Sequence, residues 1–325
     1  MKQLIPLNPN DYRRHLIHGE NRIWTETNCY VDTLVELLHS MGCEPIAALP
    51  FTLGIDFEGD QWTFFKFPHA DLFALYGLKI EELAVWRSLA QHLEEQIANG
   101  HPVLVELDSY FLPDTAGTAY QLAHIKSTVA ANEIDIEHRH LGYFHNQGYH
   151  HLDGSNFNNI FQMEGIVHAR MLPPYVEFIK RRAVQKGALL ETSLELFKTH
   201  LSLIPIKNPL LSFKERLCQE MDWLATADME TFHTYSFANL RQYGACFELS
   251  ATYLEWLIGQ GIDTHGLSDA KSNFLEISNT AKVFQFKLAR SMSRRRPLEL
   301  DMIDTMADLW DSGMSTLLAV QFPLC

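Results

Sequence analysis

Cysteine and long apolar runs are scarce in this sequence, and each shortage excludes a class of protein. The five cysteines are widely scattered and form no CxxC pair, so we expect neither a disulfide framework nor a thiolate zinc site. Residues 1–20 carry polar groups throughout and lack the apolar core of a secretory signal. No later stretch reaches the roughly 18 apolar residues that a membrane span needs. We therefore expect a cytoplasmic protein with no membrane partner.

Positive charge is also in short supply. The chain has 26 Lys and Arg against 40 Asp and Glu, which gives a formal net charge of −14. We therefore expect no general nucleic-acid binding, because phosphate contacts require clustered Lys and Arg. Two local basic clusters, at residues 180–186 and 290–296, are interpreted either as solvated helix faces or as a docking patch for an acidic partner.

The hydrophobic pattern changes near residues 165–175. Before that point helical spacing alternates with β-branched, strand-like segments, and after it the pattern is almost entirely helical. Helices are predicted at 29–42, 79–99, 240–261 and 275–296, and strands at 102–112, 124–136 and 140–146. We therefore predict an α+β protein with an N-terminal domain over residues 1–170 and an all-helical domain over residues 171–325.

Cys29 lies where a cysteine is readily activated, in the first turn of a predicted helix. Unpaired backbone N–H groups and the positive end of the helix dipole stabilise a thiolate there. His124, at the start of a predicted strand, fits the place of the base that such a nucleophile needs. Our choice for the group that orients the imidazole is Asn146, with Asp108 and Asp135 as competitors. The alternative is that the cysteine and the histidine are structural.

Several of these residues together resemble the butirosin biosynthesis protein H family. The resemblance covers residues 20–165 and is carried, in order, by Asn28-Cys29, Pro102-Val103-Leu104-Val105, Asp108-Ser109-Tyr110-Phe111-Leu112-Pro113 and His124. In that family a papain-like N-terminal domain uses a cysteine to take an acyl group from the phosphopantetheine thioester of a carrier protein. The group is then passed to an amine. The remainder, including residues 241–257, resembles a related family whose members occur with carrier proteins and amino acid:carrier protein ligases.

The resemblance implies a papain-like acyl or aminoacyl transferase with a ping-pong mechanism. Its implied partners are an acyl or aminoacyl carrier protein, which supplies the phosphopantetheine, and a small amine acceptor, with no cofactor held by the chain itself. Asn28, Asp108 and Tyr110 are assigned to the oxyanion or substrate-binding region. The family pattern has an aspartate where this sequence has His145-Asn146, which leaves the third residue of the triad open.

Two other functions remain compatible with the same residues. The first is a cysteine peptidase or amidase, in which water instead of an amine resolves the acyl-enzyme. The second is a papain-like module that has lost catalysis and retains a pocket for a ligand.

Further polar candidates lie outside this constellation. Five histidines fall between residues 138 and 151, but no fixed ligand spacing such as H-E-x-x-H accompanies them. We therefore predict no metal site and expect these histidines at a polar active-site mouth or on the surface. In the helical half, Arg241, Glu248 and Lys282 interrupt apolar helices, as expected of ligand contacts or of buried salt bridges. Arg241 is our choice there for a substrate contact.

Overall fold

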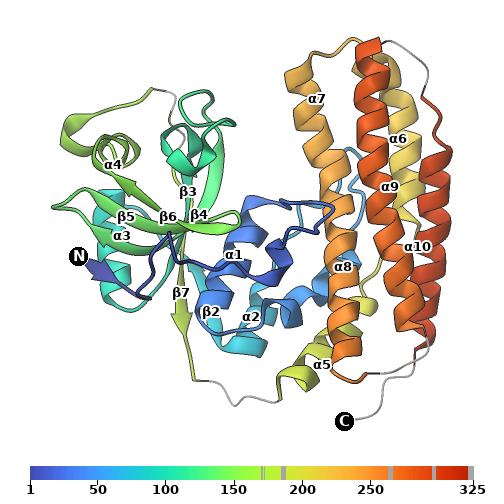
Figure 1. Ribbon diagram of the computed structural model, residues 1–325, viewed down its shortest axis with the longest axis horizontal. Helices are drawn as coiled ribbons and strands as arrows, with labels where there is room; N and C mark the ends of the chain where they lie inside the picture. The colour runs from blue at the N-terminus through green and yellow to red at the C-terminus, as the bar shows by residue number, and fades with distance from the viewer. Residues whose placement is uncertain (170, 172, 184–187, 263–265, 295–297, 321–325) are drawn as a thin grey trace. The chain divides into compact units, whose positions relative to one another are not determined.

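The alternating segments of the N-terminal half form neighbouring strands of one antiparallel, seven-stranded sheet (Figure 1). Its order is β2-β7-β3-β4-β5-β6, and β1 pairs with β4. The strands are β1 (Lys2–Gln3), β2 (Leu78–Glu82), β3 (Val103–Asp108), β4 (Lys126–Asp135), β5 (His140–His145), β6 (Gly148–Asp153) and β7 (Val176–Arg181). The predicted strands at 124–136 and 140–146 are thus confirmed as β4 and β5. The strand predicted at 102–112 is confirmed as β3 only as far as Asp108, because residues 109–111 form a 3-10 helix.

The two faces of this sheet are covered by different helices. Strand alternation sends Val103, Val105 and Val129 to one face, where they share a core with Leu93 and Ile97. The helices of this part of the chain are α1 (Cys29–Ser40), α2 (His69–Tyr76), α3 (Leu89–Ala98) and α4 (Gly154–Ile160). α3 and α4 pack on that core, whereas α1 contacts the opposite face, where the Thr33 hydroxyl donates to the carbonyl oxygen of Thr128 at 3.1 Å.

The predicted helix at 79–99 is only partly correct. Its first residues form β2, which pairs with β7, and the helix begins at Leu89 after Ser88, whose hydroxyl accepts from the Gln91 backbone N–H. Leu78 and Ile80 are buried in the sheet. The helical periodicity gave the wrong structure for residues 79–82, because these residues belong to a strand whose partner lies about a hundred residues later in the chain (Leu78 opposite Arg181).

The structure describes residues 1–169, 171, 173–183, 188–262, 266–294 and 298–320, and the chain divides into two units. We call them the sheet unit (Met1–Gly19, Asn28–Pro45 and His69–Lys186) and the helical unit (Glu20–Thr27, Ile46–Pro68 and Gly187–Cys325). The predicted boundary at residues 170 and 171 is therefore too early, because β7 completes the sheet. The predicted N-terminal domain is also not one unit, because residues 20–27 and 46–68 belong to the helical unit. Among the residues noted in the sequence, Lys186, Arg295, Arg296 and Cys325 lie outside the described part.

The helical unit contains α5 (Leu189–Leu201), α6 (Pro209–Leu224), α7 (Met229–Ser236), a π-helical turn (Phe237–Arg241), α8 (Gln242–Gly259), α9 (Leu267–Arg294) and α10 (Asp301–Ala319). α8, α9 and α10 lie side by side (Figure 1), which confirms the two helices predicted at 240–261 and 275–296. Trp24 inserts among them and its indole N–H donates to the Ser278 hydroxyl at 3.1 Å. None of the described helices is long and apolar enough to cross a membrane.

Candidate active site

Cys29 is the first residue of α1, as the sequence predicts. Asn28 caps the helix: its backbone is extended and its side-chain oxygen accepts from the Val31 N–H at 3.0 Å. Cys29 is a half-buried free thiol. The thiol thus lies in the turn whose backbone N–H groups have no partner inside the helix, which is where an anion is stabilised.

His124 is held by Asp108 and not by Asn146. Its Nδ1 lies 2.7 Å from Asp108 Oδ2, at the point where β3 ends and two residues before β4 begins. The Asp108 side chain is 7% exposed and that of His124 is 26% exposed. With Nδ1–H donating to the carboxylate, Nε2 is left as the acceptor, which is the tautomer that a general base requires.

Asp108 and Tyr110 complete the surroundings of this histidine. The second carboxylate oxygen of Asp108 accepts from the Tyr110 backbone N–H at 3.0 Å. The ring of Tyr110 stacks on that of His124, with centroids 4.4 Å apart and planes 8° from parallel. The imidazole is therefore fixed both in its plane, by the carboxylate, and from its face, by the phenol ring. The D-x-Y motif that carried the resemblance is the segment that contacts His124.

The two other candidates for the orienting group lie elsewhere. Asn146 occupies the two-residue turn between β5 and β6, with φ of 49°. Tight hairpins of this kind need positive φ, which asparagine tolerates, so its turn chemistry accounts for its presence. Asp135 ends β4, the opposite end of the strand from His124, and accepts from the His138 N–H at 3.0 Å. The assignment of Asn146 as the orienting residue is therefore corrected to Asp108.

α1 crosses the sheet on the face to which Asp108 belongs. In its first turn, Tyr30 donates to Glu177 of β7 at 3.3 Å, and one turn later Thr33 contacts β4. Strand alternation puts Leu104, Glu106 and Asp108 on this same face, opposite the core that contains Val103 and Val105. The helix start that carries Cys29 and the carboxylate that holds His124 thus share one side of the sheet. A cavity of about 310 Å³ reaches Asp108, but most of its lining, including Leu89, Ile160 and Phe161, belongs to the other side of the sheet, and neither Cys29 nor His124 lines it.

A second hydrogen-bonded histidine lies deeper in the sheet unit. His145 Nε2 is 2.6 Å from the Ser127 hydroxyl, and its Nδ1 is 2.5 Å from Asp114, which also accepts from Tyr143 at 2.5 Å. Burial acts to raise the pKa of Asp114, but His145 outweighs it and the pKa is lowered. The order serine, histidine, aspartate is that of a catalytic triad, but Ser127 is 9% exposed and His145 1%. We interpret the group as structural, because Ser127 and His145 are both buried.

One group of side chains in the described residues has the spacing of metal ligands. The ligand atoms of Glu133, His140 and His151 all lie within 4.8 Å of one another. They come from three different strands, β4, β5 and β6, so no short sequence spacing predicts the group. The prediction of no metal site rested on the absence of such a spacing.

The family of the chain follows from two domain matches. The DUF1839 N-terminal domain matches residues 13–181, and the DUF1839 C-terminal domain matches residues 186–319. The chain belongs to the DUF1839 family. No curated protein matches it. The gap between the two DUF1839 matches lies within a few residues of the end of the sheet unit, although residues 20–27 and 46–68 of the N-terminal match belong to the helical unit. Neither domain name states an activity.

The polar candidates of the DUF1839 C-terminal domain are engaged in contacts within the helical unit. Glu248 accepts from the backbone N–H groups of Ile23 and Trp24 at 2.9 and 3.0 Å. The ammonium of Lys282 lies 4.2 Å from the centre of a Trp24 ring, and burial, followed by the charge of Arg241, lowers the Lys282 pKa. These contacts hold the segment 20–27 against α8 and α9. They favour the structural interpretation of Glu248 and Lys282.

Arg241, the residue chosen from the sequence as a substrate contact, also has partners nearby. Its guanidinium is 3.7 Å from Glu26 and 5.5 Å from the Phe237 ring centre. The side chain remains about one-third exposed (34%). Its contact with the segment 20–27 is of the same kind as those of Glu248 and Lys282, so a structural role accounts for it equally well.

Proposed function

We propose that the sheet unit is a cysteine-dependent acyltransferase in which Cys29 is the nucleophile, His124 its base and Asp108 the group that orients the base. The observation that carries the proposal is the hydrogen bond of 2.7 Å between Asp108 and His124 Nδ1. It leaves the other imidazole nitrogen to accept a proton, as in the histidine of a catalytic triad. Cys29 at the start of α1 supplies the second element, a position that favours a thiolate.

A papain-like arrangement is part of the same proposal. A nucleophile at the start of a helix, packed on an antiparallel sheet whose strand end carries the base, agrees with the resemblance to the butirosin biosynthesis protein H family. That resemblance supports a phosphopantetheine thioester of an acyl or aminoacyl carrier protein as the donor and a small amine as the acceptor. The D-x-Y-F-L-P segment strengthens it, since its aspartate and tyrosine are the residues that contact His124.

The reaction has two halves. The Cys29 thiolate attacks the thioester carbonyl, and the tetrahedral intermediate collapses to acylated Cys29. The pantetheine sulfur leaves as a thiol after taking the proton of the His124 imidazolium. The amine then attacks the acyl carbon and transfers a proton to His124 as the new amide bond forms. Breaking the bond to Cys29 regenerates the thiolate and the protonated imidazole. The backbone N–H of Cys29 is the donor that we assign to the oxyanion.

A cysteine hydrolase differs from this enzyme only in the second half of the reaction. Water replaces the amine, and free acid replaces the amide. The two activities separate when the chain is incubated with an aminoacyl-carrier thioester in the presence and absence of amines. Amide formation supports the transferase, and release of acid alone supports the hydrolase.

The decisive test of the nucleophile is mass spectrometry of the full chain after incubation with an acyl-pantetheine thioester. We expect an acyl adduct on Cys29 that the Cys29→Ala variant lacks. Cys43→Ala is the matched control, because Cys43 is also half-buried and lies just beyond the other end of α1. Ser127→Ala tests the serine of the second histidine group. An adduct that survives Cys29→Ala, or that is lost in either control, would refute the assignment.

A further inference from the structure

Glu133, His140 and His151 converge across the β4, β5 and β6 strands. Glu133 lies opposite Gly142 on β5, and Gly142 lies opposite His151 on β6. Glu133, Gly142 and His151 therefore form a row across the sheet. His140 is two residues before Gly142 and therefore projects from the same face. Glu133 Oε1 is 2.8 Å from His140 Nε2 and 3.0 Å from His151 Nε2.

Gly142 makes the space in which the Glu133 carboxylate lies. A Cβ atom at this position would be 2.5 Å from Glu133 Cγ, 2.6 Å from its Oε1 and 2.2 Å from the Tyr149 hydroxyl. Any other residue in the middle of this strand would displace the carboxylate from between the two imidazoles. The arrangement of one carboxylate and two histidines thus depends on glycine at residue 142. The φ angle of Gly142 is not positive, so glycine is needed here for space and not for backbone conformation.

Surrounding groups orient the carboxylate and one of the histidines. Gln3 donates to Glu133 Oε2, which leaves Oε1 for the imidazoles. His140 uses Nδ1 to contact Asp153 at 2.6 Å and turns Nε2 toward Glu133. A second carboxylate on the outer nitrogen is the usual support of a metal-binding histidine, because it fixes the ring and raises its basicity.

The Nε2 atom of His151 is the least satisfied of these polar atoms. It is inaccessible to solvent and has no hydrogen-bond partner in the described residues, because its approach to Glu133 lacks hydrogen-bond geometry. The Glu133 side chain is itself 4% exposed. A buried carboxylate next to an unpartnered imidazole nitrogen is costly unless a proton or a cation joins them.

We propose that Glu133, His140 and His151 bind one divalent transition-metal ion of the Zn²⁺ class. Two imidazoles and one carboxylate are a ligand set that Zn²⁺ accepts, with a fourth position left for water. Ligand distances of about 2.0–2.2 Å around a tetrahedral ion separate the ligand atoms by about 3.3 Å. The observed separations from Glu133 Oε1 of 2.8 and 3.0 Å are slightly shorter, and the ligand atoms of His140 and His151 lie within 4.8 Å of each other, so side-chain rotation is needed to bring all three to an ion.

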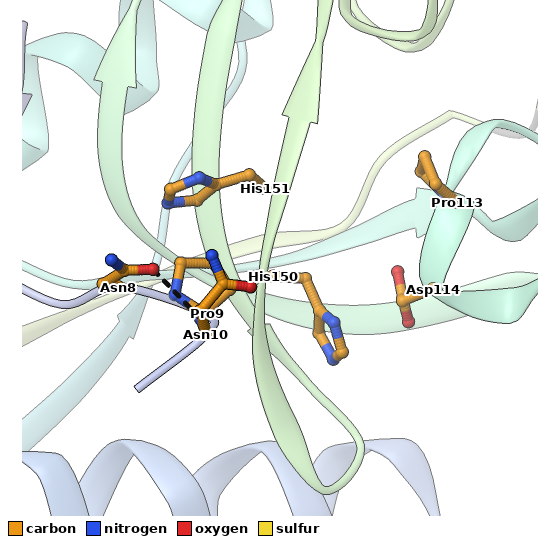
Figure 2. Close-up of a pocket in the computed structure, with 7 residues that line it drawn as sticks. All are labelled: Asn8, Pro9, Asn10, Pro113, Asp114, His150 and His151. Carbon is orange, nitrogen blue, oxygen red and sulfur yellow. Dashed lines mark hydrogen bonds between the residues drawn. The ribbon is translucent and has the colours of Figure 1, made fainter. Parts of the chain in front are cut away.

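An open cavity bordered by His151 gives the ion a route to the site. It has a volume of about 420 Å³, and its lining includes Asn8, Asn10, Asp114, His150 and His151. Figure 2 shows the His151 imidazole on the side of Asn8 and Asn10, and that of His150 on the side of Asp114. The bound ion would link the edge strand β6 to the centre of the sheet at β4, and this function does not depend on Cys29.

The test is calorimetric titration of the untagged full chain with Zn²⁺ at neutral pH. We expect one tightly bound equivalent, whose affinity falls about tenfold or more in His140→Gln and in His151→Gln. His138→Gln is the matched control, since His138 lies in the β4–β5 connection, two residues before His140, and its side chain is 75% exposed. It should bind as the wild type does. Circular dichroism establishes that each variant is folded.

Cobalt provides a second measurement that needs no calorimetric signal. Co²⁺ added to the wild type and to His138→Gln should give the visible absorption of a protein-bound ion, and His151→Gln should not. Absence of a tight equivalent in the wild type would refute the site. Equal binding by His140→Gln, His151→Gln and the wild type would refute it as well, as would an equal loss in His138→Gln.

Discussion

The Asp108 carboxylate lies 2.7 Å from His124 Nδ1, and the pair joins the end of one strand to the start of the next. β3 and β4 are hydrogen-bonded neighbours, with Asp108 opposite Lys126. The pairing that builds the sheet therefore also brings the carboxylate to the imidazole. The position of the His124 imidazole thus follows from the register of β3 against β4.

Asp108→Asn should impair acyl transfer strongly, because an amide can hold His124 in the wrong tautomer and no longer stabilises the imidazolium. We expect a loss of kcat of about 10²-fold or more, the usual range for losing general-base function. The rate of amide formation from an aminoacyl thioester measures this loss of kcat. Asn146→Gly is the control, since glycine keeps the positive φ of the turn and removes the amide, and it should retain activity within about twofold. Full activity in Asp108→Asn together with loss in Asn146→Gly would favour Asn146 as the orienting residue.

The sequence predicts the parts of the fold that depend on local pattern. The alternation in β3, β4 and β5 and the helical spacing in α1, α8 and α9 each result from one face being buried. β2 and β7 were missed because each is a short segment whose partner is distant: Leu78 pairs with Arg181. The position of Trp24 in the helical unit has no local signal either, since its contacts are with Glu248 and Ser278.

The same distinction applies to the candidate site. Cys29 and His124 could be chosen from their places at the start of a helix and of a strand. The choice between Asp108 and Asn146 depended on which strand end lies beside His124, and that follows from the register of β3 against β4. The group of Glu133, His140 and His151 could not be predicted from the sequence for a similar reason. Its side chains meet only when the register of three strands is known.

Ser127→Ala should lower stability and leave acyl transfer unchanged. The mutation removes the hydroxyl that donates to the buried His145 Nε2, which leaves that nitrogen without its observed partner. We expect a loss of about 1–3 kcal/mol in the free energy of unfolding. Urea denaturation measures the stability, and amide formation measures the activity. If activity disappears while the fold persists, Ser127 is a nucleophile and the structural interpretation of this histidine group fails.

Gly244→Ala should destabilise the helical unit although alanine favours helices. A Cβ atom at residue 244 would lie 2.4 Å from the Trp24 ring, so the indole must move within a packed core. We expect a net loss of about 1–3 kcal/mol, as for other overpacked sites. Gly259→Ala is the matched control in the same helix: its added Cβ would meet no atom within 4 Å. The control should be neutral or slightly stabilising by helix propensity. Equal effects in thermal unfolding would contradict the close packing of Trp24.

The buried ion pair of His18 with α1 should make stability depend on pH above neutrality. His18 lies between Asp32, at 3.2 Å from its Nε2, and Glu36, which contacts its Nδ1. Burial acts to lower the pKa of His18, but the hydrogen bonds and charges of Asp32 and Glu36 prevail and raise it to about 9. The folded protein therefore keeps a proton that the unfolded chain releases near pH 6.5.

Because the pKa is higher in the folded state, the stabilisation is complete below about pH 6.5 and is lost as the pH rises through about 9. The shift corresponds to about 3 kcal/mol. We expect the urea-derived free energy of unfolding to fall across this window in the wild type. His18→Gln should be less stable at low pH, because two buried carboxylates lose their cation, and should show a flatter profile. His138→Gln, at an exposed histidine, should keep the wild-type slope. An identical slope in His18→Gln and the wild type would mean that another group carries the pH dependence.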